Sequence, residues 1–127
     1  MMNIGYQNFE QLEVWIMSRQ LKNDIFKLVQ AFPSQEKFRL YDQLIRSSRS
    51  INAQIAEGHG RRTYPDRLRF CAQARGSLSE TLNHLIDALD CNYIDEQKLN
   101  QFRIQISGVE KLLNGYINYL ERMIQKH

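Results

Sequence analysis

Residues 95–126 read DEQKLNQFRIQISGVEKLLNGYINYLERMIQK, and this stretch decides the fold. Its apolar residues recur at alternating steps of three and four, which is the spacing of one stripe along an α-helix. Asp95 comes just before the stripe and is expected to cap the helix. A stripe this regular is typical of a helix that packs against other helices. Its members are Leu99, Phe102, Ile106, Val109, Leu113, Tyr116, Leu120 and Met123.

Three earlier segments have the same periodicity, and each ends at residues that stop a helix. Pro33 disfavours helix in the residue before it, and Pro65 suits a first helical turn. The expected helices run over residues 9–32, from the Ser34 cap to the Gly58-His59-Gly60 stretch, and over residues 64–90. Short connections make neighbouring helices antiparallel. The sequence therefore predicts an all-α fold, an up-down antiparallel four-helix bundle, as a single domain over residues 1–127.

The first and last of these helices carry more apolar residues than one stripe requires. The stripe of the first helix comprises Val14, Ser18, Leu21, Ile25, Leu28 and Phe32. The additional residues are Trp15, Ile16, Phe26 and Val29 in the first helix, and Ile104, Leu112, Ile117 and Ile124 in the last. Wide stripes are ordinary in globular helices, whereas a second apolar face is typical of a subunit interface, and the sequence leaves both interpretations open.

Small residues gather in the two middle helices and favour close packing between them. They are Ser47, Ser48, Ala53 and Ala56 in one helix, and Ala72, Ala74, Gly76 and Ser77 in the other. A glycine inside a helix costs about 1 kcal/mol relative to alanine, so close packing at Gly76 is the expected compensation. The alternative is that small side chains are simply tolerated there.

The composition is that of a folded, helical protein. Hydrophobic residues make up 43% and charged residues 24% of the chain, which argues against disorder, and two prolines are few for a turn-rich β-sandwich. No apolar run is long enough to span a membrane, and the first residues lack the features of a signal peptide, so we expect a cytoplasmic protein without a membrane partner. Cys71 and Cys91 form no CxxC pair and are expected to be reduced packing residues.

The search for catalytic motifs is negative, because the chain has no P-loop, GxGxxG, HExxH, GxSxG or ExxH sequence. We therefore expect no enzymatic activity, no catalytic residue, no metal and no cofactor. The nearest candidate for a metal site is the trio Glu80, His84 and Asp87, which share one face of the third helix. That face points away from the leucine stripe, which favours a solvated polar surface over the alternative of a metal-dependent enzyme.

The net charge of +3 conceals two oppositely charged regions. Between Lys37 and Arg75 there are nine basic and three acidic residues, a balance of +6, and the rest of the chain, with eight basic and eleven acidic residues, carries −3. Eight of the nine basic residues are arginine, which suits bidentate contacts with phosphate and stacking on bases. The middle of the chain is therefore where a polyanionic partner is expected.

Arginines in this region form an outward stripe that ends in a cluster. At about 100° per residue, Arg39, Arg46 and Arg49 share an arc opposite the apolar side of the second helix. The cluster that follows includes a tyrosine, which suits phosphate contacts with occasional base stacking. The predicted nucleic-acid-binding residues, with RNA or DNA as partner, are Arg39, Arg46, Arg49, Arg61, Arg62, Tyr64, Arg67 and Arg69. The alternative is a solvated basic face, or pairing with acidic residues of another protein, in which case the protein is an interaction scaffold.

Arg75 is expected to lie apart from that stripe. It shares a helix face with Cys71, Leu78 and Leu82, so a partly buried guanidinium there needs an anion. Glu57, at the end of the second helix, is the predicted partner of Arg75 in a structural salt bridge.

Several stretches carry a family resemblance that covers nearly the whole chain. They are Phe9–Trp15 (FEQLEVW), Phe32-Pro33 with Glu36, Gln43–Arg46 (QLIR), Ser50–Arg61 (SINAQIAEGHGR) and Ala74–Glu80 (ARGSLSE). They resemble the bacterial four-helix-bundle family named for proteins encoded in intervening sequences of 23S ribosomal RNA genes, which includes accessory variability proteins of diversity-generating retroelements. Gln54 departs from the family pattern, which usually has asparagine there. The resemblance implies a homopentameric barrel of four-helix protomers with a basic surface and, for the retroelement members, binding to RNA or DNA and to a reverse transcriptase.

Overall fold

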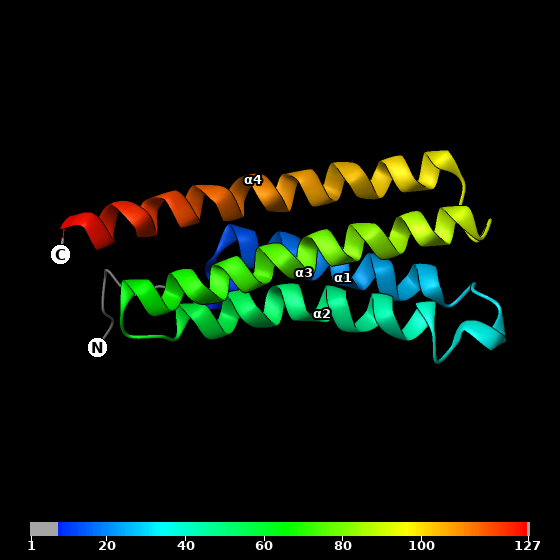
Figure 1. The fold of residues 1–127 in the computed structure, drawn as a ribbon, viewed down its shortest axis with the longest axis horizontal. Coiled ribbons are helices and arrows are strands. Elements are labelled where there is room, and N and C mark those ends of the chain that lie inside the picture. The colour runs from blue at the N-terminus through cyan, green and yellow to red at the C-terminus, as the bar shows by residue number, and fades with distance from the viewer. Residues whose placement is uncertain (1–7, 127) are drawn as a thin grey trace.

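The computed structural model describes residues 8–126, whose fold is a bundle of four antiparallel α-helices (Figure 1). The helices are α1 (Glu13–Val29), α2 (Leu40–His59), α3 (Tyr64–Asp90) and α4 (Glu96–Lys126). Two short 3-10 helices, η1 (Phe9–Gln11) and η2 (Ser34–Glu36), precede α1 and α2. The predicted all-α, up-down four-helix bundle is confirmed. Residues 1–7 and 127, which the predicted domain includes, lie outside the described residues.

The first helix is shorter than the sequence predicts, because its first turn is a separate 3-10 helix. Asn8 caps η1 through a capping box with Gln11. Leu12 then has extended backbone, with φ −71° and ψ 127°, so α1 starts only after it. The ring of Phe9 packs edge-on against Trp15, with 5.1 Å between the ring centroids. This aromatic contact stabilises η1 against α1.

The second helix also starts later than predicted, whereas the third and fourth start where the sequence places them. Ser34 begins η2 instead of capping α2, and Arg39 has a non-helical backbone, with φ −125° and ψ −110°. At the start of α3, the Thr63 hydroxyl accepts a hydrogen bond from a first-turn amide at 3.3 Å. Asp95 caps α4 in the same way at 2.8 Å, as predicted.

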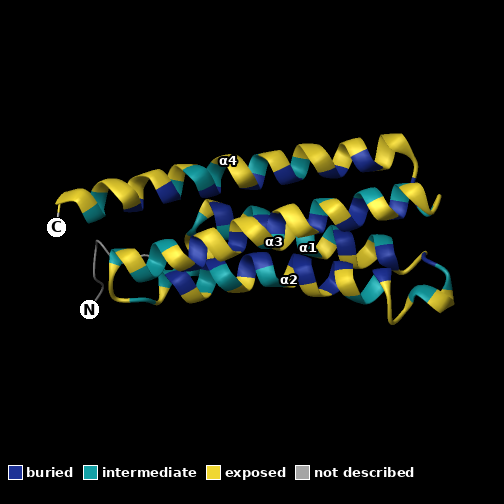
Figure 2. Ribbon diagram, viewed as in Figure 1, coloured by how far each residue is buried: buried dark blue, intermediate teal, exposed yellow. Residues whose placement is uncertain are grey.

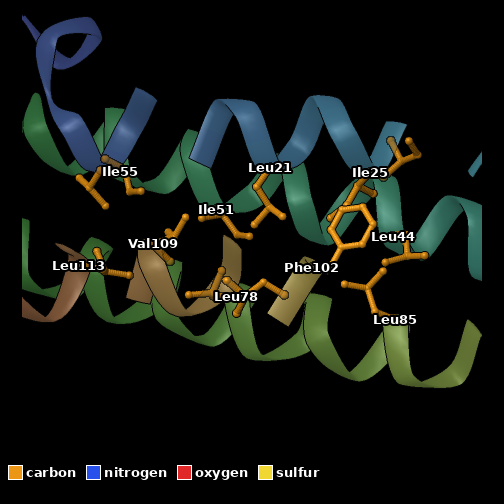
Figure 3. Close-up of a cluster of buried hydrophobic side chains, with 14 of the residues drawn as sticks. Leu21, Ile25, Leu44, Ile51, Ile55, Leu78, Leu85, Phe102, Val109 and Leu113 are labelled. Carbon is orange, nitrogen blue, oxygen red and sulfur yellow. The ribbon is translucent and has the colours of Figure 1, made fainter. Parts of the chain in front are cut away.

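One buried stripe from each helix faces the centre of the bundle (Figure 2). Figure 3 labels the middle of this core, formed by Leu21, Ile25, Leu44, Ile51, Ile55, Leu78, Leu85, Phe102, Val109 and Leu113. The predicted stripes of α1 and α4 are mostly confirmed, with Val29 buried in α1 and Leu28 only half-buried. In α4, Tyr116 and Met123 are likewise half-buried.

The additional apolar residues of α1 and α4 divide between the core and the surface. Val29 and Ile117 are 1% and 6% exposed, whereas Ile16, Phe26 and Ile104 are 50%, 45% and 75% exposed. A subunit interface at the exposed ones stays a prediction. Across residues 8–126, no helix combines the length and the hydrophobicity that a membrane crossing requires.

Small polar side chains join α2 to α3. The Thr81 hydroxyl donates a hydrogen bond to the Ser47 oxygen at 2.9 Å, and the hydroxyl oxygens of Ser50 and Ser77 lie 3.0 Å apart. Thr81 and Ser47 are both buried, and their hydrogen bond gives each hydroxyl a partner, without which its burial would be costly. The sequence prediction of close packing between these two helices holds at this level of the bundle.

The close approach is not made at the glycine that the sequence indicated. A Cβ atom at Gly76 would meet nothing within 4 Å, so the packing predicted there is wrong. At Gly58, near the end of α2, a Cβ atom would lie 2.8 Å from the Cβ of Phe70 on α3. Gly58 is therefore the position where the absence of a side chain lets the helices meet.

Apolar side chains close the end of the bundle where α1 leads to α2 and α3 leads to α4. Phe32 is buried, and its ring centroid lies 5.2 Å from that of Tyr93 in the α3–α4 turn. Ile94 in the same turn is also buried. Asn92 has φ 62°, a left-handed conformation that asparagine tolerates better than most residues, and this permits the tight turn.

Candidate nucleic-acid interface

The opposite end of the bundle is open, because α1 is much shorter than α4. α1 has 17 residues and α4 has 31, so at about 1.5 Å per residue α4 is roughly 20 Å longer. The last turns of α4 run past the start of α1, beside the turn between α2 and α3 (Figure 1). These turns are largely exposed (Figure 2). Within residues 8–126, the face that a longer α1 would cover is therefore exposed.

A hollow of about 790 Å³ lies at this end, between η1, the α2–α3 turn and α4. Its size falls within the range of small-ligand sites, about 300 to 1,000 Å³. Three arginines and three aromatic residues contribute to its walls: Phe9, Arg61, Arg62, Arg67, Tyr116 and Tyr119. The hollow therefore combines positive charge with aromatic surface.

The two tyrosines of α4 form one aromatic wall. Tyr116 and Tyr119 are three residues apart, so they lie on the same side of the helix. Their ring centroids are 6.2 Å apart and their planes differ by 14°, a stacked arrangement. Tyr119 is 42% exposed, and Tyr116 lies deeper. The exposed ring is thus held nearly parallel to a partly buried one.

A hydrogen bond fixes Arg67 near this wall. Its Nε donates to the backbone carbonyl of Arg61 at 2.7 Å. Burial raises the pKa of the Tyr116 phenol above its usual value, and this outweighs the lowering effect of Arg67 on that pKa. Tyr116 is therefore neutral at physiological pH.

Arg61 and Arg69 differ from Arg67, because acidic residues compensate their charges. Nη2 of Arg61 lies 2.6 Å from the Glu57 carboxylate, and Nη2 of Arg69 lies 2.7 Å from the Asp66 carboxylate. Both guanidinium carbons also lie 4.6 Å from the ring centroid of Phe70. These two arginines thus form a local network at the start of α3.

Comparison with known proteins places the chain in a family. A model of the 23S rRNA-intervening sequence proteins matches residues 10–115. The chain belongs to the 23S rRNA-intervening sequence protein family. The match includes both stretches of the α2–α3 region that carried the resemblance, Ser50–Arg61 and Ala74–Glu80.

A solved structure shows the same fold. It is a protein with unknown function from the S23 ribosomal protein family of Bacteroides thetaiotaomicron VPI-5482. The two chains superpose with a TM-score of 0.76 at 24% sequence identity, over 82% of this chain and 97% of that one. At this identity the likeness concerns the fold. No curated protein matches the chain.

In this member of the 23S rRNA-intervening sequence protein family, the predicted salt bridge between Glu57 and Arg75 is wrong. Glu57 pairs with Arg61, one helical turn away, and Nη1 of Arg75 donates to the Asn114 side chain on α4 at 3.1 Å. Both Glu57 and Arg75 are exposed. The physical reason is helix register: the core-facing position of α3 is Ala74, fully buried, and the next residue lies at the surface.

The predicted binding residues do not all lie together. Arg62 and Arg67 line the hollow with Arg61, and Arg62 also lines a smaller hollow of about 430 Å³ with Tyr64. Arg69 lies next to this group through Asp66 and Phe70.

The stripe on α2 leads away from the hollow. Arg46 is highly exposed, with its guanidinium 3.8 Å from Asp42, and Arg49 is exposed on the same helix. Arg39 precedes α2, so it lies about 33 Å along the axis from Arg61 and belongs to the closed end of the bundle. Arg46 lines a separate hollow between α2 and α3, with Ser50 and Ser77, so the stripe and the larger hollow are distinct surfaces.

The aromatic walls were missed by the sequence prediction. The sequence pattern places Tyr116 in the core stripe of α4 and indicates no binding role for Phe9 or Tyr119. The spacing of Tyr116 and Tyr119 near the end of a helix is a usable signal, because residues three apart share one face. It becomes informative only once the length of α1 is known.

The candidate metal trio on α3 is only partly assembled in this family member. His84 Nε2 lies 3.1 Å from the Glu80 carboxylate, and its Nδ1 lies 4.0 Å from that of Asp87. The expectation of a solvated surface is wrong for His84, which is 9% exposed. It follows Thr81 on the flank of α3 that packs against α2. Among the described residues, no three His, Cys, Asp or Glu side chains are placed to hold a metal ion.

Proposed function

We propose that this protein is a non-enzymatic, cytoplasmic accessory protein that binds RNA or DNA through the arginines of the α2–α3 end. The observation that supports this most is the hollow, where Arg61, Arg62 and Arg67 stand beside exposed aromatic surface. Arginine binds phosphate through bidentate hydrogen bonds, and aromatic rings stack on bases. A surface that offers both fits nucleic acid better than it fits an acidic protein.

The charge balance of this region supports the same proposal. From residue 57 to residue 69 there are four arginines and two acidic residues, which is a local charge of +2. Arg39, Arg49 and Arg62 are exposed, and no ion pair among residues 8–126 involves any of them. Because Arg39 lies at the closed end, Arg49 and Arg62 are the charges most available to phosphate on the way to the hollow and at its rim.

We further propose a homo-oligomer, a pentamer, in which five copies repeat this weakly charged site, and which assists a reverse transcriptase. Repetition increases overall affinity because the second and later contacts are intramolecular. The exposed Ile16, Phe26 and Ile104 give such an assembly apolar surface to bury. Light scattering at micromolar concentration should give about five times the 15.1 kDa of one chain. A mass near one chain would contradict the pentamer.

Nucleic-acid binding is tested by a salt titration of labelled RNA and DNA. Removing Arg49 and Arg62 together, as Arg49→Ala with Arg62→Ala, should lower affinity about tenfold or more and reduce the slope of log K against log salt by about 2, because two phosphate contacts are lost. The matched control is Arg103→Ala with Lys111→Ala, which removes the same charge from exposed positions on α4.

The control pair should bind as the wild type does. Equal affinity and slope for both double variants would contradict the proposal. That result would favour the alternative, an interaction scaffold without nucleic acid, for which Phe38 at 87% exposed and Ile104 at 75% exposed offer apolar contact points.

A further inference from the structure

We propose that the hollow at the α2–α3 end receives an unpaired base, so that the protein binds single-stranded RNA or DNA in preference to duplex. This inference rests on the proposed function and adds the class of nucleic acid that the site selects. Three features of the hollow support it: an oriented aromatic ring, a free arginine at the rim and a fixed arginine inside.

The ring of Tyr119 is the stacking platform. It is 42% exposed, and its plane lies within 14° of that of Tyr116, which is itself partly buried. Its orientation is therefore constrained before any ligand arrives. A pre-oriented ring loses little conformational freedom when a base stacks on it. Every base offers a flat π surface, so a site of this kind reads the presence of an unpaired base, not its sequence.

The arginines at the hollow suit the rest of the nucleotide. Arg62 is exposed at the rim, between the two hollows that it lines, where it can follow the phosphate backbone. Arg67 lines the hollow with Tyr116, and its Nε donates a hydrogen bond to the carbonyl of Arg61. A guanidinium carries five N–H donors, so donors are left over for a base edge or a phosphate oxygen.

The depth of the site explains why strandedness would matter. In a duplex, both faces of a base are covered by its neighbours, and extruding it costs a few kcal/mol in lost stacking and pairing. A single strand offers its bases without that cost. Duplex would therefore contact only the outer arginines, whereas a single strand would also fill the hollow.

The experiment compares labelled strands of about a dozen nucleotides by fluorescence anisotropy at one salt concentration. The probes are single-stranded RNA, single-stranded DNA, the DNA duplex of the same length, and a single strand with abasic sites. The wild type should bind a single strand at least about fivefold more tightly than either the duplex or the abasic strand.

The decisive variant is Tyr119→Ala. It should weaken single-strand binding by about 5- to 100-fold and leave duplex binding and the salt slope unchanged, because it removes stacking and no charge. The control is Phe38→Ala, which removes an aromatic ring that is 87% exposed near the closed end. This control should bind every probe as the wild type does.

The outcomes separate the inference from the proposed function. If the wild type binds duplex and single strand equally and Tyr119→Ala changes neither, the base site is refuted while phosphate binding stands. If no probe binds at low salt, both fail. If Tyr119→Ala weakens all probes alike and changes the mass in light scattering, the hollow is covered by a second copy of the chain, and the inference is overturned.

Discussion

The two ends of this bundle differ in how the four-helix core ends. At the closed end, the connections bring Phe32, Tyr93 and Ile94 over the core, and the buried stripe continues to the last turn. At the open end, α1 begins late, and Arg62 and Tyr119 line a hollow instead. The same helices therefore end in a closed core at one end and, in our proposal, in a binding site at the other.

The comparison is tested most strongly by removing one aromatic ring from each end. Phe32→Ala should lower the free energy of unfolding by about 3 kcal/mol, because it leaves a cavity in the core. Tyr119→Ala should lower it by less than about 1 kcal/mol, because that ring is already partly exposed. Urea unfolding followed by circular dichroism, at a fixed protein concentration, measures both. Equal losses would mean that the open end is as much a part of the core as the closed end.

Thiol reactivity shows whether the core stays closed beneath the hollow. Burial raises the pKa of the Cys71 thiol from 9.0 to about 11, whereas Cys91 is exposed near the closed end. At pH 8, iodoacetamide should modify Cys71 about a hundredfold more slowly than Cys91, as read by mass spectrometry. Cys91→Ser should be nearly unreactive until it is unfolded. Rapid modification of Cys71 in the folded protein would show that the open end admits solvent to the core.

The same thiol makes stability depend on pH. The fold keeps Cys71 neutral, and the unfolded chain loses this proton first as the pH rises. The free energy of unfolding should therefore fall as the pH increases from about 9 toward 11. Cys71→Ala should reduce that dependence, and an unchanged pH profile would contradict it.

Two glycines test how closely α2 and α3 pack beneath the open end. Gly58→Ala should destabilise the protein by about 2 kcal/mol, because the new Cβ would overlap the Cβ of Phe70. Gly76→Ala should stabilise it by about 0.5 to 1 kcal/mol, since that position is open and alanine is the better helix former. The two variants control for each other in urea unfolding. A loss of stability at Gly76 would mean that its surface is covered in the assembled protein.

The smallest effect is expected when Asp66 is replaced. Its carboxylate compensates the charge of Arg69 and lies near the guanidinium of Arg61. Asp66→Asn should free positive charge at the open end, tighten nucleic-acid binding about threefold and raise the salt slope by up to about 1. Asp90→Asn makes the same chemical change near the closed end and should leave affinity unaltered. Anisotropy titrations measure both. Weaker binding by Asp66→Asn would show that the network positions the arginines more than it masks them.

The sequence predicts the helices better than it predicts their ends. The regular stripe of α4 and the Asp95 cap specify one helix almost completely, because the spacing of the apolar residues and the capping residue indicate the same helix. The start of α1 could not be predicted, since residues 9–14 continue a helical pattern through Leu12, whose extended backbone breaks it. Local propensity does not distinguish a 3-10 turn with its own capping box from the first turn of an α-helix.

The candidate site divides in the same way. The arginine cluster is visible in the sequence because charge patterning is a local property. The pairing of Glu57 with Arg75 was wrong because a shift of one residue moves a side chain by about 100° around a helix, which periodicity alone does not resolve for a single residue. The tyrosines of the hollow depend on the length of another helix, so no local pattern reports them.

The 17 residues of α1 against the 31 of α4 have a consequence for how this family can diversify. The depth of the hollow is set by how many turns α1 has, and each turn takes about four residues. Insertions or deletions before α1 would fill or deepen the site while every core position stays the same. Changes in the length of this segment would therefore add or remove the hollow in relatives of this protein, although a comparison of aligned residue identities does not score such changes.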